Sequence, residues 1–222
     1  LPEYEGSGNY RPIPFLSARL QHGPYYVQLR GPRLEANLVS GEFLRMGPLL
    51  NLRFEREDLE NDQVDALPRV DYALEAGAFA SARFPVGRDS RQALTLRMDF
   101  LHDVTGVHEG YLVSPSLEYS AAIRPRIVAS LTLSTTYAGG GYTETYFTVT
   151  PSGSAASGLP VFRADSGIKD AGVGLDVRYR LTERLGVVAL GRWTRLLGDA
   201  RESPIVDRVG DPHQLFGGMF IS

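Results

Sequence analysis

Residues 171–181 read Ala-Gly-Val-Gly-Leu-Asp-Val-Arg-Tyr-Arg-Leu. Successive side chains of a β-strand point to opposite faces, so this segment has one apolar face and one face that carries an aspartate and two arginines. A soluble barrel would turn the apolar face inward, whereas a transmembrane barrel turns it toward lipid and keeps the charges in a wet lumen. The alternation therefore predicts a barrel strand and leaves open which face meets water.

The same alternation recurs along the chain and predicts strands over 12–20, 25–39, 42–55, 70–84, 91–104, 109–122, 126–138, 170–181, 185–197 and 213–222. Many of these segments are longer than the usual globular strand of about five or six residues. A tilted strand that crosses a membrane needs about 9–11 residues. The lengths therefore predict an all-β, antiparallel transmembrane β-barrel.

Composition narrows the classes of function. The net charge of −3 argues against nucleic acid, whose phosphates require a basic surface. The absence of cysteine excludes disulfides, thiolate nucleophiles and zinc–thiolate sites. No run of about 18 apolar residues occurs, so no transmembrane helix is expected. We expect residues 1–222 to form a single outer-membrane β-barrel domain with no cofactor and no metal.

The connections differ in length. Short polar turns are expected at 87–90, 124–126 and 182–184, and longer loops at 56–69, 138–169 and 199–212. Outer-membrane barrels have short turns on the periplasmic side and long loops outside. Two details stay open: Gly31-Pro32 marks a bulge or a hairpin, and 142–149 is a further strand or part of a loop.

The two ends of the sequence also carry an expectation. Residues 1–7 have the composition of a loop, and the last predicted strand stops in phase at Ser222. Bacterial barrels have an even number of strands. We therefore expect one strand before Leu1 and a few residues after Ser222, with twelve strands in the intact protein and ten to twelve within these residues.

Three groups of residues carry a more specific signal than the alternation of apolar and polar side chains. They are Pro2–Ser7 with Tyr10–Pro14; Tyr146–Pro151 with Ala155–Pro160 and Lys169-Asp170; and Leu196–Ala200 with Ser203–Val206. Together they resemble the MipA/OmpV family of Gram-negative outer-membrane proteins. The resemblance extends from the first residues to the last strand.

The resemblance implies a barrel in the Gram-negative cell outer membrane without enzymatic activity. It also implies a scaffold for the peptidoglycan machinery, with a murein transglycosylase and a murein synthase as partners. Membrane lipid, lipopolysaccharide and a second copy in a dimer are further expected partners, and nucleic acid is not. A specific interface buries about 800 Å² per partner, for which short turns offer little area. The alternative function is a small-solute pore or ligand-binding barrel with an Arg-rich lumen.

Two clusters were considered as catalytic sites. Asp99 and His102 have opposite parity on one strand, so a base and its carboxylate would not meet there. The second cluster, Ser203 with Asp199 and His213, lies around one loop, and the chain has no Gly-x-Ser-x-Gly motif. We therefore expect no catalytic residue.

The lumen is the first candidate site. All basic residues except Lys169 and the histidines are arginines, whose planar forks suit networks with carboxylates. The charges of the inward phase that could contact a solute are Arg45, Arg53, Glu75, Arg97, Asp99, Glu118, Asp176, Arg178, Arg180 and Arg192. Paired charges would close the lumen, whereas free arginines would line a channel. We expect Arg178 and Arg180 each to pair with a carboxylate of an adjacent strand.

The long loops are the second candidate site, because functional residues concentrate on loops held by a rigid scaffold. The residues singled out there are Tyr146, Phe147, Ser157, Gly158, Leu159, Pro160, Asp199, Ser203 and Pro204. The alternative is that these loops fold inward and only constrict the lumen.

The outward residues carry two further expectations. Lipid contact is expected for Leu94, Leu96, Leu131, Leu133, Val173, Leu175 and Val177. Two girdles are expected to contain the rings of Phe54, Tyr72, Phe84, Tyr111, Tyr137, Tyr179 and Trp193.

Overall fold

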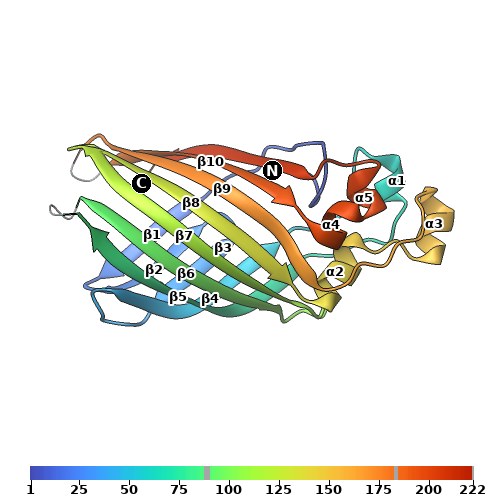
Figure 1. Cartoon of the computed structure of the whole chain (residues 1–222), viewed down its shortest axis with the longest axis horizontal. Coiled ribbons are helices and arrows are strands. Elements are labelled where there is room, and N and C mark those ends of the chain that lie inside the picture. The colour runs from blue at the N-terminus through green and yellow to red at the C-terminus, as the bar shows by residue number, and fades with distance from the viewer. Residues whose placement is uncertain (88–90, 183–184, 222) are drawn as a thin grey trace.

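The computed structural model describes residues 1–87, 91–182 and 185–221. In these residues eleven strands form one antiparallel sheet in which each strand pairs with its neighbours in the chain. The sheet curls around a lumen, with the helices gathered at one end and the short connections at the other (Figure 1). We call these the cap end and the turn end. The all-β, antiparallel architecture is confirmed, and the strand number falls within the expected range.

The strands are β1 (Ser17–His22), β2 (Tyr25–Arg30), β3 (Arg33–Asn37), β4 (Leu44–Arg53), β5 (Ala73–Val86), β6 (Gln92–Asp103), β7 (Tyr111–Arg124), β8 (Ile127–Ala138), β9 (Gly167–Arg180), β10 (Gly186–Leu196) and β11 (His213–Ile221). Most boundaries lie within two or three residues of the expected ones. The first predicted strand, 12–20, is an exception, since β1 begins only at Ser17. The predicted turns at 87–90 and 182–184 fall partly on residues 88–90 and 183–184, which lie outside the described residues.

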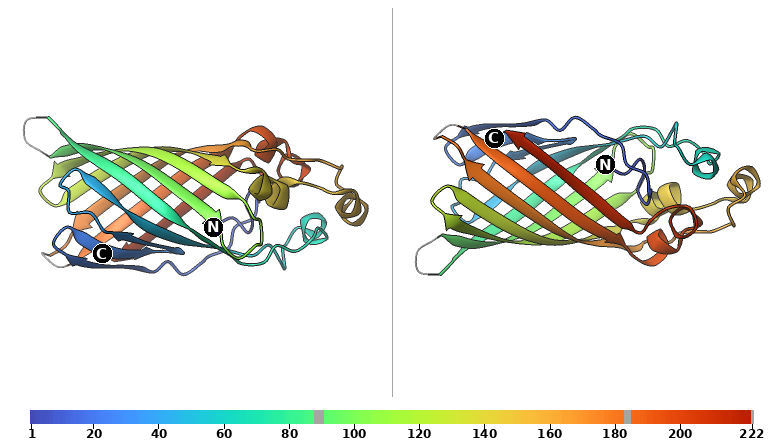
Figure 2. Two further views of the ribbon diagram at one scale, coloured as in Figure 1. Left: turned by 90° about the horizontal axis from the view of Figure 1, so that it is seen from below. Right: turned by 90° about the horizontal axis from the view of Figure 1, so that it is seen from above.

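Segment 25–39 is a hairpin of two strands. Gly31 has a φ of 59°, the left-handed conformation that glycine adopts without strain, and Arg30 pairs with Arg33 across the turn. β1, β2 and β3 are therefore short, and β3 pairs with β4 only through residues 33–35. Beyond them toward the cap end, the N-terminal residues lie beside β11, where Phe15 contacts the rings of Phe216 and Phe220 (Figure 2).

Segment 142–149 is not a strand. Helix α2 (Gly140–Phe147) occupies it and buries Tyr142, Tyr146 and Phe147. These three residues are spaced by four and five positions, so a helix brings them to one face, whereas a strand would divide them between two. Burial of that face against the sheet overrides the local alternation.

Two of the three prolines inside the described strands, Pro48 and Pro115, interrupt a ladder, because proline has no amide hydrogen to donate. The β3–β4 pairing ends at Glu35 and Leu49, one position before Pro48. In the β7–β8 pairing, the register skips Pro115 between Val113 and Ser116. The strands continue past both sites because their other edges remain paired.

The cap consists of five short helices: α1 (Asp62–Asp65), α2, α3 (Pro151–Ser157), α4 (Gly198–Glu202) and α5 (Pro204–Asp207). Local capping sets their boundaries. Asn61 accepts the amides of Gln63 and Val64 at the start of α1, and Gly158 ends α3 with a φ of 74°. None of the helices in the described part of the chain is long and apolar enough to span a membrane.

The outer face of the sheet is apolar. Cross-strand pairing aligns Leu96, Leu117, Leu133 and Val173, and the next such row holds Leu94, Leu131 and Leu175. Six of the seven residues expected to contact lipid are in these two rows, and the seventh, Val177, pairs with Ala129 on the same face. The strand phases inferred for these residues are therefore correct.

The outward aromatic rings fall into two groups. Phe54 and Tyr72 contact each other at the cap end, with ring centroids 6.4 Å apart. Tyr111 stacks on Tyr137 with centroids 6.2 Å apart, and Trp193 also lies in the half of its strand nearer the cap. Phe84 and Tyr179 lie near the turn ends of β5 and β9. The rings therefore divide between the cap end and the turn end, as expected for two girdles.

Candidate functional site

The register places all ten predicted charges on the inner face of the sheet. Residues paired directly across strands share a face, and Arg45 pairs with Ser81, which pairs with Arg97. Similar chains of pairing connect the remaining positions on β4 to β10. The inward set is Arg45, Arg53, Glu75, Arg97, Asp99, Glu118, Asp176, Arg178, Arg180 and Arg192. The structure thus brings them to one lumen, where they form separate groups.

The first group crosses the lumen between β3 and β6, which are not neighbours in the sheet. Arg33 binds Asp99 at 2.8 Å, and Arg97 binds both Asp99 and Glu35 at 2.7 Å. The Tyr26 hydroxyl donates to Glu35 at 3.0 Å. These ion pairs connect two strands that are separated by β4 and β5 in the sheet.

A second cross-lumen pair corrects the expectation for Arg178 and Arg180. Asp176 binds Arg30 of β2 at 2.7 Å, and the Arg180 guanidinium donates to the Pro125 carbonyl at 2.8 Å. Neither Arg178 nor Arg180 makes an ion pair within the part of the chain that the structure describes. The register explains this for Arg178, because its neighbours across the two adjacent ladders are Val128 and Val188.

The third group surrounds Glu75, which is fully buried near the cap end. Arg53 donates to Glu75 at 2.9 Å and Asn51 donates at 2.7 Å. His108 Nε2 lies 3.3 Å from the same carboxylate. Three partners from β4 and from the β6–β7 loop therefore satisfy one buried charge, as burial of a carboxylate requires.

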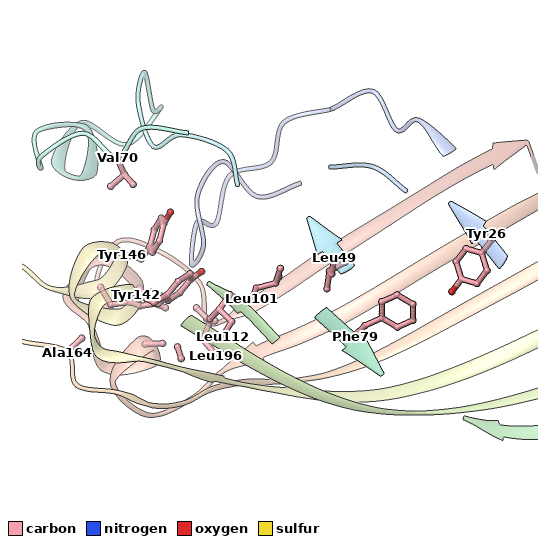
Figure 3. Close-up of a cluster of buried hydrophobic side chains, with 14 residues drawn as sticks. Tyr26, Leu49, Val70, Phe79, Leu101, Leu112, Tyr142, Tyr146, Ala164 and Leu196 are labelled. Carbon is pink, nitrogen blue, oxygen red and sulfur yellow. The ribbon is translucent and has the colours of Figure 1, made fainter. Parts of the chain in front are cut away.

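Helix α2 lies directly above this group. The Arg53 guanidinium carbon is 4.7 Å from the Tyr142 ring centroid and 5.6 Å from that of Tyr146, within the range of a cation–π interaction. Burial raises the pKa of both tyrosines, so both hydroxyls stay protonated. Figure 3 shows the two rings beside Leu101 and Leu112 at the cap end of the lumen.

An apolar row closes the wall beneath α2. Leu49, Leu101, Leu112 and Ala138 are buried and belong to one row of cross-strand neighbours, with Gly77 between Leu49 and Leu101. These side chains face inward and join the core cluster that contains Tyr142 and Phe147. These side chains therefore fill the part of the cap end that lies beneath α2.

A fourth group links the N-terminal segment to β9. Lys169, the only lysine, is buried and binds Glu5 and Asp170, the latter at 2.6 Å. The Tyr142 hydroxyl donates to Glu5 at 2.5 Å. Burial raises the pKa of Glu5, but Lys169, Arg53 and the two hydrogen bonds outweigh it and hold this pKa below its usual value. Glu5 is therefore a carboxylate at neutral pH.

The predicted loop residues belong to the helices and turns of the cap. Tyr146 and Phe147 lie in α2, Ser157 caps the end of α3 by donating to the Gly153 carbonyl, and Gly158 supplies the left-handed turn. Asp199 accepts the amide of Asp165 at 2.7 Å. All nine predicted loop residues lie in the cap, namely Tyr146, Phe147, Ser157, Gly158, Leu159, Pro160, Asp199, Ser203 and Pro204.

The three groups of residues that carried the resemblance meet in this cap. The Ser203 hydroxyl donates to the Phe147 carbonyl at 2.6 Å, joining the second group to the third. Tyr4 of the first group is buried in a cluster with Val149, Leu159 and Ile205. A Cβ atom on Gly6 would lie 2.4 Å from Val206, so the close approach requires glycine.

A cavity of about 450 Å³ lies between the N-terminal segment and strands β4, β10 and β11. Its lining includes Glu5, Arg53, Tyr146, Asp170 and Arg192. The cavity therefore adjoins both buried charge groups of the cap end.

The catalytic clusters considered from the sequence are separated. Asp99 faces the lumen within its arginine pairs, whereas His102 faces outward with Nδ1 2.9 Å from the Gly110 carbonyl. Ser203 is fully buried against the Phe147 carbonyl, and the His213 ring stacks on Trp193. Among the described residues, no three His, Asp or Glu side chains are placed to hold a metal ion.

Sequence reasoning missed Glu5, His108 and Tyr142, all of which lie outside the predicted strands or in the segment whose structure was left open. The alternation of side chains along a strand cannot indicate residues that lie outside the strands. Two features of the sequence indicated this group: Glu5 lies in the Pro2–Ser7 segment that carries the resemblance, and Lys169 is a single lysine among arginines.

The comparisons with known proteins agree with this arrangement. The family model described as MltA-interacting protein MipA matches residues 1–222. A search of curated proteins finds no match. With the matched range covering the barrel strands and the cap together, the chain belongs to the MipA family of MltA-interacting proteins.

Proposed function

We propose that this protein is a non-enzymatic barrel of the Gram-negative outer membrane that docks a murein transglycosylase of the MltA type. The observation that carries the membrane part is the contrast between the two faces of the sheet. Outward positions such as Leu96, Leu133 and Leu175 are exposed and apolar, while the strand charges collect inside. A wall of this kind suits lipid outside and water inside.

The filled cap end favours docking over conduction. A solute pore needs a wet passage through the whole lumen, but Leu49, Tyr142 and Phe147 are fully buried across the cap end. The arginine pairs of β3 and β6 add a second constriction below them. A protein with this interior is better suited to presenting surfaces than to passing solutes.

The family description supplies the partner class, and the turn end supplies a surface. Short turns of outer-membrane barrels face the periplasm. At this end the β3–β4 connection, residues 38–43, exposes Leu38 at 64% and Phe43 at 57%. Exposed aromatic side chains are common anchors of protein interfaces. We place the docking surface on this connection, with a murein synthase as a second candidate partner.

Capture from detergent extract tests the proposal. The full chain, an unrelated barrel and the Phe43→Ala variant are immobilised and exposed to a purified MltA-type transglycosylase. We expect the wild-type chain alone to retain the enzyme, with retention reduced about tenfold or more by Phe43→Ala, the size of a hot-spot loss. Leu215→Ala, which alters an exposed residue on β11, is the matched control. Retention equal to that on the unrelated barrel would reject the docking role.

A further inference from the structure

Several inward arginines near the turn end of the lumen make no ion pair with a carboxylate of the described residues. Arg19 of β1, Arg45 of β4 and Arg178 of β9 face inward, and none makes an ion pair within the described ranges. Arg19 instead donates to the side-chain oxygens of Gln21 and Gln28 at 3.2 and 3.0 Å. We call these three residues the basic lumen surface.

The members of the basic lumen surface lie near one another. The Arg19 guanidinium carbon is 3.9 Å from the Tyr26 ring centroid, and that of Arg45 is 6.0 Å from the same centroid. Arg19 is also within electrostatic range of Arg178. Like charges held this close repel each other, and an anion between them would remove the repulsion.

Most of the inward carboxylates nearby already bind other arginines. Glu35 and Asp99 bind Arg97, and Asp176 binds Arg30. Glu118 of β7 is the remaining inward carboxylate of this half, and it makes no ion pair in the portion described. One free carboxylate faces three free guanidinium groups, so this part of the lumen has an excess of positive charge.

The wall formed by β7 and β8, of which β8 adjoins β9, is lined with hydroxyls. Its half-buried inward residues include Ser116, Ser130, Thr132 and Ser134. Arg45 and Arg178 are exposed to solvent. Hydroxyl donors facing guanidinium forks form a suitable environment for an oxyanion.

We propose that the basic lumen surface and the facing hydroxyls bind a small solute that carries carboxylate or phosphate groups and enters from the turn end. Guanidinium groups pair with both kinds of oxyanion through two parallel hydrogen bonds. The side chains packed beneath α2 narrow the cap end, so we expect the solute to bind and leave through the turn end. The site is independent of the docking role, because it lies inside the barrel rather than on its rim.

Calorimetric titration of the full chain in detergent at low ionic strength tests this site with two probes, citrate and inorganic phosphate. We expect saturable binding of at least one probe, and the stronger of the two identifies the preferred oxyanion. The double variant Arg45→Gln/Arg178→Gln should weaken this binding about a hundredfold, about tenfold for each charge-assisted contact. Arg69→Gln, which removes an exposed arginine that pairs with Glu57 in the β4–β5 loop, is the control and should bind like wild type.

Thermal unfolding distinguishes a binding site from a structural role. Without anion, the double variant should melt at the same temperature as wild type or higher, because it loses a repulsion and no ion pair. Addition of the bound probe should raise the melting temperature of wild type only. Failure of wild type to bind either probe at millimolar concentration, or equal binding by the double variant, would overturn the proposal.

Discussion

The cap-end half and the turn-end half of the lumen are built from the same strands and the same inward register, yet their charges behave differently. At the cap end Glu75 is fully buried and has three partners, whereas at the turn end Glu118 and Arg178 have no ion-pair partner in the described chain. The difference comes from the connections. Long loops fold back over the cap end and bring His108, Tyr142 and Glu5 to the strand charges. At the turn end the Pro125 carbonyl of the β7–β8 turn accepts a hydrogen bond from Arg180 without neutralising its charge.

The largest expected effect comes from removing one carboxylate in each half. Glu75→Ala leaves Arg53 buried without its counter-ion and should lower the free energy of unfolding by about 3–5 kcal/mol. Glu118→Ala removes an unpaired, partly exposed charge and should change it by less than about 0.5 kcal/mol. Guanidinium titration of both variants in phospholipid vesicles measures the difference. Equal costs would mean that the two halves do not differ as described.

The outer wall should not share this asymmetry. Leu133→Arg places a charge near the middle of β8 on the apolar face and should cost about 2–4 kcal/mol in a bilayer. Ile127→Arg, at the turn end of the same strand, should cost about 0–1 kcal/mol. The same titration in vesicles measures both variants. A cost independent of depth would contradict the membrane orientation of this face.

Disruption of the cap should leave the turn end unchanged. Ser203→Ala leaves the buried Phe147 carbonyl without its 2.6 Å donor and should cost about 1–3 kcal/mol. Hydrogen exchange should then quicken in α2, α4 and α5 but not in β1 to β3. Ser152→Ala alters an exposed hydroxyl of α3 and serves as the control. Faster exchange at both ends would show that the halves unfold as one unit.

The smallest effect concerns pH. The pKa of Glu5 is held below its usual value of 4.5, so its carboxylate contributes stability above about pH 4.5, and this contribution is lost as pH falls through the folded pKa. Acidification from pH 7 toward pH 3 should therefore speed hydrogen exchange in the cap. Glu5→Gln should flatten this part of the profile, while Glu3→Gln should leave it as in wild type. An unchanged profile in Glu5→Gln would remove Glu5 as its source.

Several features of the molecule could be predicted from local residues. Alternation over 171–181 and its counterparts gave the correct face for every charge in the lumen set, because side-chain direction in a strand depends only on parity. The same reasoning left 142–149 open between a strand and part of a loop, and Tyr142 and Tyr146 of this segment pack as one helical face. Burial of that face against the sheet outweighed a local pattern that suited either structure.

The sequence by itself determined which side chains share the outer face and which share the lumen, since that division is made by parity within each strand. It could not determine which lumen charges pair. Arg30 reaches Asp176 across 146 residues of sequence, and Glu5 reaches Lys169 across 164. Such contacts depend on how the sheet curls and where the loops return. Only the tertiary structure therefore decided that Glu75 and Glu5 are paired at the cap end while Arg19, Arg45 and Arg178 make no ion pair among the described residues.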